Sequence, residues 1–329
     1  MNYCLNIILE KLIRKYCIIN KLYCNIMIKN FNEFVNESKM MKFQPIIKWS
    51  GSKRSQCEEI LPKFPHNINT YYEPFCGGCS MLMGLLHSDI TVKRYVCSDL
   101  NGDLINLWNE IKENPDEVYE TYNKLWEELN KDNDIDRKKK YFEQQRTEYN
   151  KTHSPLIFFF IMRTTTNGMP RYNSRGEFNN SFHVTRNGIE PERLKPILYD
   201  WSIKLKRNNV EFRHCSYDSI LKDVKKDDFV YLDPPYANTK GMYFGGIDLN
   251  AFFDFLRSLT KKDVKFALSF DGKSGEEDNT YSVPKDCYMK HYYIKSGNSS
   301  FKRTIGNNKN AIVWESLYLN YEEINYGFW

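Results

Sequence analysis

The sequence contains no uninterrupted apolar run of the roughly 18 residues that a membrane span needs. Apolar residues are patchy between Met1 and Phe31, where charged residues interrupt every candidate core of a signal peptide. The interrupting residues are Glu10, Lys11, Arg14, Lys15, Lys21 and Lys29. We therefore expect an intracellular protein without a targeting signal, in which residues 1–40 are an appendage. An amphipathic helix and an extension from an upstream start codon are both open for it, because Met40 and Met41 directly precede the first motif.

A second C-x-x-C pair is also missing. The nine cysteines show this spacing at Cys76 and Cys79, whereas a zinc ribbon needs two such pairs. An odd number of scattered cysteines favours free thiols in a reducing compartment over a disulfide framework. We expect no bound metal, and redox activity of the single pair is the alternative.

Charge of one sign is not in large excess, since 47 lysines and arginines accompany 42 aspartates and glutamates, a formal net charge of +5. This balance permits a polyanionic partner without requiring one.

We find no internal repeat and no low-complexity linker. With 329 residues, 41% of them hydrophobic, the chain is long enough for one large α/β domain with an insertion or for two modest domains. Frequent lysine, asparagine, isoleucine and tyrosine indicate an AT-rich genome, for which a viral or phage source is one option.

From Thr70 onward, short β-rich runs alternate with helical stretches, a pattern typical of a mostly parallel sheet covered by helices. The predicted strands are residues 70–73, 92–97, 210–215, 228–232 and 264–270, followed by 288–294 and 311–319 as a C-terminal hairpin. The predicted fold class is therefore α/β with a Rossmann-like sheet.

Between Leu104 and about Asp200 the pattern changes in a way that a parallel sheet cannot absorb. Residues 124–151 are long, charged and helical, and residues 158–182 are aromatic and loop-like. We predict an inserted second domain joined to a nucleotide-binding core. The basic run at residues 137–140 is a candidate phosphate patch or, as the alternative, a solvated helix face.

The strongest local motif is Asp233-Pro234-Pro235-Tyr236, directly after the apolar run at residues 229–232. Buried parallel strands present functional groups at their carboxyl ends, so this motif is expected at the mouth of the sheet. Two prolines stiffen the turn and leave backbone carbonyls free to accept hydrogen bonds from a substrate amino group. The alternative is a simple turn with a buried tyrosine.

A second motif, residues 72–80, has the sequence Tyr-Glu-Pro-Phe-Cys-Gly-Gly-Cys-Ser and precedes an apolar helix at residues 81–86. Glycines between a strand and a helix allow close backbone approach to a nucleotide-like cofactor. Asp99 follows about 20 residues later at a strand end, where a carboxylate can accept both hydroxyls of a ribose. Alternatively, Asp99 caps the helix that begins near Gly102.

The third motif, residues 47–53, lies upstream of the glycine loop and reads Ile-Lys-Trp-Ser-Gly-Ser-Lys. Trp49 offers a flat face and Lys53 a cation, and either can close over a cofactor. The alternative is a loop with a buried tryptophan.

In this order the motifs resemble the Dam-like family of DNA adenine N6-methyltransferases, in which a cofactor loop, a target-recognition insertion and Asp-Pro-Pro-Tyr follow one another. The resemblance spans roughly residues 42–321. It is strengthened by residues 167–179, Asn-Gly-Met-Pro-Arg-Tyr-Asn-Ser-Arg-Gly-Glu-Phe-Asn, which are similar to the family's DNA-gripping segment.

The resemblance implies an S-adenosylmethionine-dependent methyltransferase domain made of residues 41–103 and 201–329, with a target-recognition domain inserted at residues 104–200. It implies direct methyl transfer from S-adenosyl-L-methionine to N6 of an adenine flipped out of double-stranded DNA, without a metal. A monomer or weak dimer is expected, and a role in restriction-modification or as a lone methylase stays open.

In that chemistry, Asp233 and the Pro234 carbonyl accept the two amino hydrogens of adenine, and Tyr236 stacks on the base. The implied cofactor contacts are Trp49, Lys53, Phe75, Gly77, Asp99 and Asp233.

The implied DNA contacts are Lys48, Asn167, Arg171, Asn173 and Asn179. For Arg171, bidentate contact with guanine and a phosphate contact without sequence information are both open. His183 and Arg186 are further candidates for the DNA side, although His183 could equally be an ordinary surface histidine. A basic loop at residues 299–303 is a weaker candidate for a backbone contact.

Two departures from the family pattern concern this chain. Cys79 replaces a third glycine of the loop, which we expect to cost little because cysteine is small. Residues 180–183 read Asn-Ser-Phe-His where many relatives have Val-Pro-Phe-Gly, so the target sequence stays open.

Three other functions compete with this interpretation. RNA adenine and cytosine N4 are alternative acceptors, but the cytosine enzymes tend to resemble Ser-Pro-Pro-Tyr, so Asp233 favours adenine. A non-catalytic DNA-binding regulator that retains the fold is the rival from another class.

Overall fold

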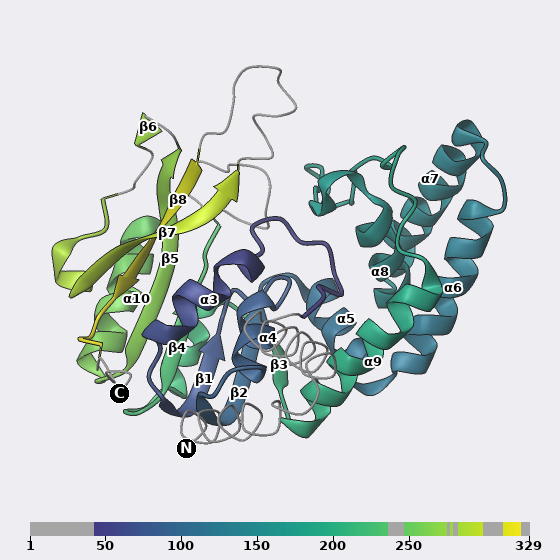
Figure 1. Ribbon diagram of the computed structural model, residues 1–329. Coiled ribbons are helices and arrows are strands. Elements are labelled where there is room, and N and C mark those ends of the chain that lie inside the picture. The colour runs from purple at the N-terminus through teal and green to yellow at the C-terminus, as the bar shows by residue number, and fades with distance from the viewer. Residues whose placement is uncertain (1–42, 236–246, 275–276, 279–281, 299–311, 324–329) are drawn as a thin grey trace, which may run out of the picture. The chain divides into compact units, whose positions relative to one another are not determined.

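The computed structural model describes residues 43–235, 247–274, 277–278, 282–298 and 312–323 (Figure 1). The predicted appendage, Tyr236 and the basic loop at residues 299–303 lie outside the described residues.

A mixed sheet forms the centre of the fold, with the strand order β3-β2-β1-β4-β5-β8-β7 and a short β6 (Glu277–Asp278) paired with β5. The other strands are β1 (Asn67–Glu73), β2 (Thr91–Asp99), β3 (Glu211–His214), β4 (Phe229–Leu232), β5 (Lys265–Ser274), β7 (Lys290–Asn298) and β8 (Ile312–Leu319). Strands β1 to β5 pair in parallel, whereas β8 is antiparallel to β5 and β7. The predicted α/β class, the strands and the antiparallel C-terminal pair are confirmed.

The strand order reverses between β1 and β4. From β1 the chain adds β2 and β3 on one side, and β4 and β5 lie on the other. Ligands of open α/β sheets bind at such a switch point, outside the carboxyl ends of the strands. Here those ends are Glu73 of β1 and Asp233, which directly follows β4.

All four residues of β4 are buried. Since successive side chains of a strand point to opposite sides, both faces of β4 are covered. Val230 and Leu232 belong to the hydrophobic cluster formed with α10 (Leu249–Lys261). Phe229 and Tyr231 instead contact Phe64, with ring centroids 4.5 and 5.7 Å away. That second face also carries α3 (Cys57–Ile60), η2 (Leu61–Lys63) and α4 (Ser80–Leu86).

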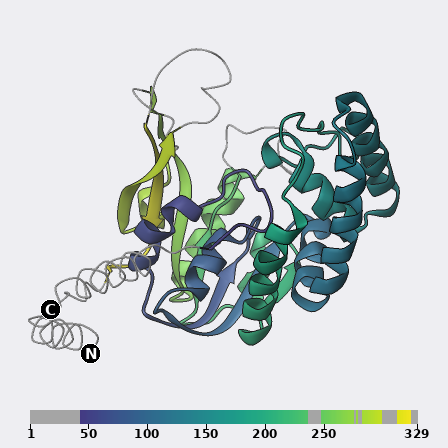
Figure 2. The ribbon, with the colours of Figure 1, turned by 45° about the vertical axis from the view of Figure 1, so that its right-hand side comes forward.

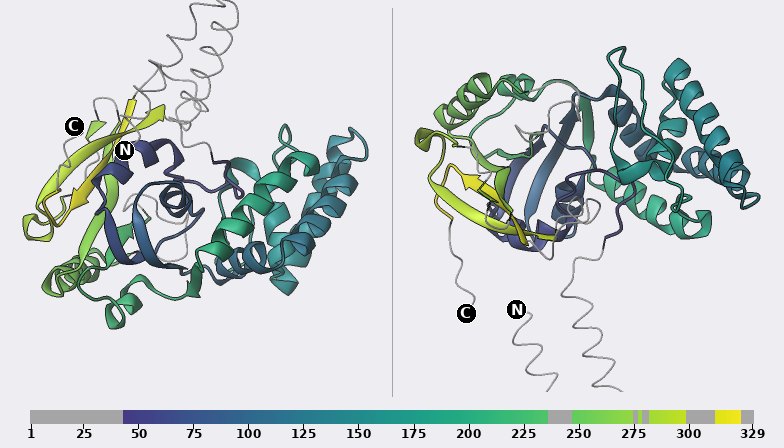
Figure 3. Two further views of the ribbon diagram at one scale, coloured as in Figure 1. Left: turned by 60° about the horizontal axis from the view of Figure 1, so that its bottom comes forward. Right: turned by 90° about the horizontal axis from the view of Figure 1, so that it is seen from above.

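Five helices group beside the β3 edge of the sheet, as Figures 1, 2 and 3 show from different sides. They are α5 (Gly102–Glu113), α6 (Pro115–Asn130), α7 (Ile135–Thr152), α8 (Pro155–Thr164) and α9 (Pro191–Arg207). Helix α5 joins the two parts, because it contacts β2 and β3 as well as α8 and α9. No helix among the described residues is both long and apolar enough to cross a membrane.

The helical stretch predicted at residues 124–151 is two helices, because Asp134 begins α7 by accepting hydrogen bonds from the backbone N–H groups of Asp136 and Arg137. Arg137 does not form a free phosphate patch. Its guanidinium donates to the carbonyls of Glu128 and Leu129 and pairs with Asp132 at 2.7 Å. Arg137 therefore joins α7 to the end of α6.

The predicted loop at residues 158–182 is wrong for its first part, which is α8. Ser154 caps this helix and Pro155 occupies its first turn. Its residues 158–162 are all buried, and α8 packs against α5, α6 and α7. A helix that is apolar on every side shows no amphipathic period, so its pattern did not indicate a helix.

After α8, a largely irregular segment returns across α7. We call residues 165–186 the recognition loop. Isolated bridges join Thr165 to Phe182 and Tyr172 to Phe178. The Asn150 amide of α7 accepts from Phe178 N at 2.8 Å and donates to Phe178 O at 3.0 Å. These bonds hold the recognition loop against the helices.

Candidate active site

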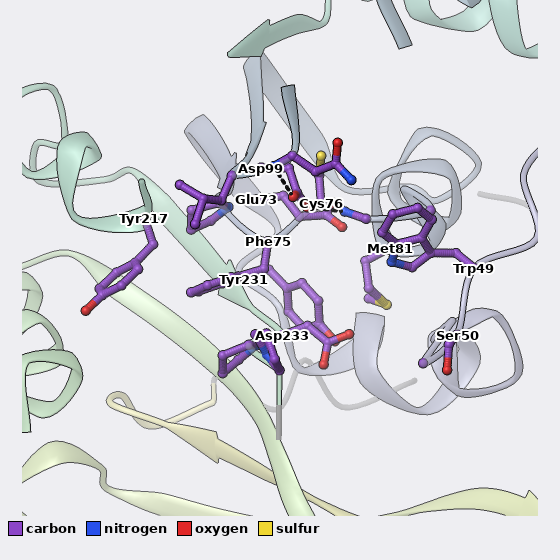
Figure 4. Close-up of a pocket in the computed structure, with 18 of the residues that line it drawn as sticks. Trp49, Ser50, Glu73, Phe75, Cys76, Met81, Asp99, Tyr217, Tyr231 and Asp233 are labelled. Carbon is purple, nitrogen blue, oxygen red and sulfur yellow. Dashed lines mark hydrogen bonds between the residues drawn. The ribbon is translucent and has the colours of Figure 1, made fainter. Parts of the chain in front are cut away.

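A pocket of about 300 Å³ opens at the carboxyl ends of β1 and β4. Its lining includes all six residues predicted to contact the cofactor, namely Trp49, Lys53, Phe75, Gly77, Asp99 and Asp233, and also Pro234. Figure 4 shows Phe75 between Asp99 and Asp233, with Trp49 to one side. Three motifs that are distant in sequence thus contribute to one cavity.

The glycine loop requires its first glycine. Gly77 has a φ of +43°, and a Cβ placed there would lie 2.6 Å from Nε1 of Trp49. On the other side, Trp108 Nε1 donates to the Gly77 carbonyl at 2.9 Å. The loop is therefore packed between two tryptophans, and a side chain at Gly77 would displace Trp49.

Cys79 begins α4 with a left-handed φ of 52° and is fully buried. Its small side chain packs in the core, but this backbone region disfavours any residue with a Cβ by roughly 1–2 kcal/mol. The Cys76 and Cys79 thiols are free and buried. Burial raises the pKa of Cys76 to about 11 and that of Cys79 well above its usual value. These shifts disfavour the reactive thiolate that redox chemistry requires.

Asp99 does not cap α5. The cap is Asn101, whose side chain accepts from Leu104 N at 3.1 Å. The Asp99 carboxylate instead accepts from Gly77 N at 3.1 Å and Asn101 N at 2.9 Å. It therefore joins the end of β2 to the glycine loop and lines the pocket.

Lys53 is 3% exposed and contacts two carboxylates. Its Nζ lies 2.8 Å from Asp233 Oδ1 and 3.2 Å from Glu315 Oε2. Burial raises the pKa of Asp233 to about 6, Lys53 opposes the rise and Glu315 adds to it. The cation predicted for the cofactor thus also stabilises the ionised form of Asp233.

Sequence reasoning assigned no role to several residues around this pocket. Glu73 is buried and accepts from the Tyr71 hydroxyl at 2.8 Å, and burial raises its pKa to about 8. Tyr217 stacks on Phe75 with ring centroids 5.4 Å apart. Glu73 stands inside the glycine-loop motif. No local pattern marks Tyr217, the first residue of the 3-10 helix η4 (Tyr217–Lys222), or Glu315 of β8.

Lys48 lies against the recognition loop. A Cβ on Gly168 would come within 2.7 Å of Lys48 Cβ. Burial, together with the charges of Arg186 and Arg163, lowers the pKa of Lys48 to about 8. Burial, Arg186 and Lys48 also lower the pKa of His183. Lys48, His183 and Arg186 are thus close enough for mutual repulsion.

The other predicted DNA residues divide into two groups. Asn167, Arg171 and Asn179 are exposed on the recognition loop. Asn173 is engaged within the loop, because its Nδ2 donates to Glu177 Oε2 at 2.7 Å and its Oδ1 accepts from Glu177 N at 3.0 Å. These bonds favour a structural role for the Asn173 side chain.

The sequence of this chain is similar to a family model and to several proteins of known function. Residues 49–296 match the family model for the D12 class N6 adenine-specific DNA methyltransferase. A DNA adenine methylase of Haemophilus influenzae is 29% identical over 246 residues, covering 70% of this chain and 80% of the relative. A type II methyltransferase of Methanocaldococcus jannaschii is 30% identical over 308 residues, covering 85% of this chain and 100% of the relative. The family match covers the glycine loop, the recognition loop and Asp233 alike, and this chain belongs to the D12 class of N6 adenine-specific DNA methyltransferases.

Proposed function

We propose that this methyltransferase transfers the methyl group of S-adenosyl-L-methionine to N6 of an adenine that is flipped out of double-stranded DNA. The observation that carries the proposal is the single pocket in which Asp99, Asp233 and Pro234 converge at the switch point of the sheet. Such a pocket can hold a nucleoside-like donor and an amino-group acceptor side by side.

The pocket has the groups that this donor needs. The Asp99 carboxylate can accept hydrogen bonds from ribose hydroxyls, and the Phe75 and Tyr217 rings offer apolar surface for an adenine ring. Trp49 covers the glycine loop at Gly77. The bound sulfonium supplies an activated methyl group, so transfer needs no covalent enzyme intermediate.

The acceptor side is built by Asp233 and Pro234. The exocyclic nitrogen of adenine is a weak nucleophile, because its lone pair is delocalised into the ring. The Asp233 carboxylate and the Pro234 carbonyl would accept its two hydrogens and orient that lone pair. We assign base stacking to Tyr236 from the motif alone, because this residue lies outside the described part of the chain.

Ionised Asp233 is the stronger hydrogen-bond acceptor, because a neutral carboxyl carries a proton on one oxygen and lacks the negative charge. Since burial raises its pKa to about 6, activity should fall as the pH decreases through that value.

For DNA, we propose that residues 104–200 form the target-recognition domain and that the chain acts as a monomer or weak dimer. Support comes from Asn167, Arg171 and Asn179, which are exposed on the recognition loop, and from Lys48, which lies against this loop and is repelled by its Arg186. A duplex phosphate or base edge would relieve the repulsion between these cations.

The test is transfer of labelled methyl from S-adenosyl-L-methionine to unmodified duplex DNA, with nucleosides identified by mass spectrometry. We expect N6-methyladenine from the wild type, at least a 100-fold loss in Asp233→Ala, and unchanged activity in Asp89→Ala, an exposed aspartate outside the pocket. Label in N4-methylcytosine, or label in RNA offered in a parallel reaction but none in DNA, would replace the proposal by that acceptor. DNA binding without any product, and indifferent to Asp233→Ala, would indicate a binding protein.

A further inference from the structure

We infer that Glu315 is a positioning residue for methyl transfer, which acts through Lys53 to orient the Asp233 carboxylate in the pocket. The inference rests on the proposed function, in which ionised Asp233 accepts a hydrogen bond from the adenine amino group. It assigns a task to a strand residue that belongs to none of the sequence motifs.

Among the described residues, the Lys53 ammonium contacts two carboxylates and one backbone carbonyl. Its Nζ lies 2.8 Å from Asp233 Oδ1, 3.2 Å from Glu315 Oε2 and 3.3 Å from the Gly51 carbonyl. The ammonium charge is thus shared between two carboxylates, and the Asp233 oxygen is the nearer of the two. With its side chain only 4% exposed, Lys53 has little freedom to turn, so its direction fixes where Asp233 Oδ1 lies.

Glu315 is itself held in place. It projects from β8, and its Oε1 accepts a hydrogen bond from Ser296 Oγ of the paired strand β7 at 2.7 Å. Strand β8 also pairs with β5, which pairs with β4, and Asp233 follows β4 directly. A rigid set of strands therefore sets the separation between the two carboxylates that share Lys53.

The charge arrangement is costly if its only purpose is structural. One buried cation and one carboxylate already balance, and a second carboxylate adds desolvation and repulsion. The β7 and β8 strands are paired along their length without it. Its direct effect falls on Asp233, because the Glu315 charge opposes ionisation of Asp233 and the Lys53 charge favours it.

Among the described residues, the charged and titratable groups facing Asp233 are Lys53, Glu315 of β8, Glu73 of β1 and Tyr231 of β4. Burial raises the pKa of Glu73 to about 8 and that of Tyr231 well above its usual value. Both are therefore predominantly neutral below pH 7. The fall in activity toward low pH, which we call the acid limb, should then reflect protonation of Asp233 under the influence of Lys53 and Glu315.

The experiment measures kcat/KM and kcat for methyl transfer to a DNA duplex from pH 5 to 8. In Glu315→Gln we expect the midpoint of the acid limb to move to lower pH by roughly one unit, and in Lys53→Met to higher pH by a similar amount. Looser orientation should lower kcat of Glu315→Gln by roughly fivefold to tenfold, with KM for DNA within twofold of wild type.

The matched control is Glu323→Gln. Glu323 is also partly buried, with 18% of its side chain exposed against 14% for Glu315, and it also pairs with a lysine, Lys63, at 3.8 Å. It does not contact Asp233, so its acid limb should match the wild type. Cofactor affinity from equilibrium binding and the melting temperature should differ little between the two glutamine variants.

An unshifted acid limb in folded Glu315→Gln, or a shift equal to that of Glu323→Gln, overturns the inference. If Glu315→Gln does not fold, Glu315→Asp keeps the charge and shortens the side chain. It should retain the wild-type acid limb with a lower kcat, and an unchanged kcat overturns the inference. Absence of N6-methyladenine from the wild type would instead refute the proposed function itself.

Discussion

Three carboxylates line one pocket, and each contacts a different kind of polar partner. Asp99 accepts from two backbone N–H groups, Glu73 accepts from the Tyr71 hydroxyl, and Asp233 contacts the Lys53 ammonium. Amide donors and a cation stabilise an ionised carboxylate, whereas burial favours the neutral acid. The pocket can therefore hold carboxylates of different charge near neutral pH.

Glu73→Gln should change how stability depends on pH. The folded-state pKa of Glu73 is raised to about 8 from an ordinary value of 4.5, so the folded state binds its proton more tightly than the unfolded state. Its contribution is fully favourable below pH 4.5 and is lost as the pH rises through 8. The glutamine variant lacks this loss.

The measurement is urea unfolding at pH 6.5 and 8.0, a window above the Asp233 pKa of about 6. Between these values the wild type should lose on the order of 1–2 kcal/mol more than Glu73→Gln. Parallel losses in both proteins would contradict the protonated state of Glu73.

For single residues, a position at the end of a predicted strand was sufficient to identify Asp99 and Asp233 as site residues. Glu315 had no such marker, because nothing in a strand sequence records which cation its side chain meets. The Asp233 motif also did not indicate that Lys53 would contact it directly.

Among the elements, the glycine loop gives a steric prediction. Gly77→Ala should weaken cofactor binding at least tenfold and lower the melting temperature, since the new Cβ would lie 2.6 Å from Trp49 Nε1. Gly176→Ala is the matched control, because Gly176 also has a positive φ, +77°, but nothing within 4 Å of its Cβ. Calorimetric titration with S-adenosyl-L-methionine compares the two. Equal affinities of the two variants for the cofactor would show that the contact with Trp49 does not limit this position.

The two hydrogen bonds between Asn150 of α7 and Phe178 of the recognition loop give a second prediction. Asn150→Ala leaves the N–H and C=O of Phe178 without this partner, so the loop should loosen. We expect DNA binding to weaken roughly threefold to tenfold in fluorescence anisotropy, with cofactor affinity unchanged. Asn123→Ala removes an exposed amide of α6 that donates to Glu127 and should have no effect. Loss of cofactor binding in Asn150→Ala would contradict a role confined to the loop.

Elements with a clear period were predictable, and α8 was not. The strands alternate with helices in a way that the sequence displays, whereas residues 158–162 have no polar face to mark a helix. Only the surrounding helices α5, α6 and α7 make this conformation favourable, by burying every side of it.

For the whole molecule, we predict that the fold needs the chain from Phe43 but not the residues before Met41. Phe43, Ile46 and Ile47 are buried, and the Gln44 carbonyl accepts from Trp201 Nε1 at 2.8 Å. A chain beginning at Met41 should match the full chain in melting temperature and methyl transfer.

A chain beginning at Lys48 is the contrasting variant. It lacks the three buried apolar side chains and should lose on the order of 5 kcal/mol in free energy of unfolding. Equal stability of the two shortened chains would show that this segment contributes little, and instability of the chain beginning at Met41 would make residues 1–40 part of the fold.

The sequence by itself determined the α/β class, the strands and the motifs that meet at the pocket, because those properties depend on local period and on residues placed directly after strands. It also displayed the resemblance to the family that the comparison established. Only the tertiary structure decided that Lys53 lies between Asp233 and Glu315 and that Asn101, not Asp99, caps α5. Charge state and contact depend on burial and on neighbours from distant parts of the chain, and these exist only once the strands have paired.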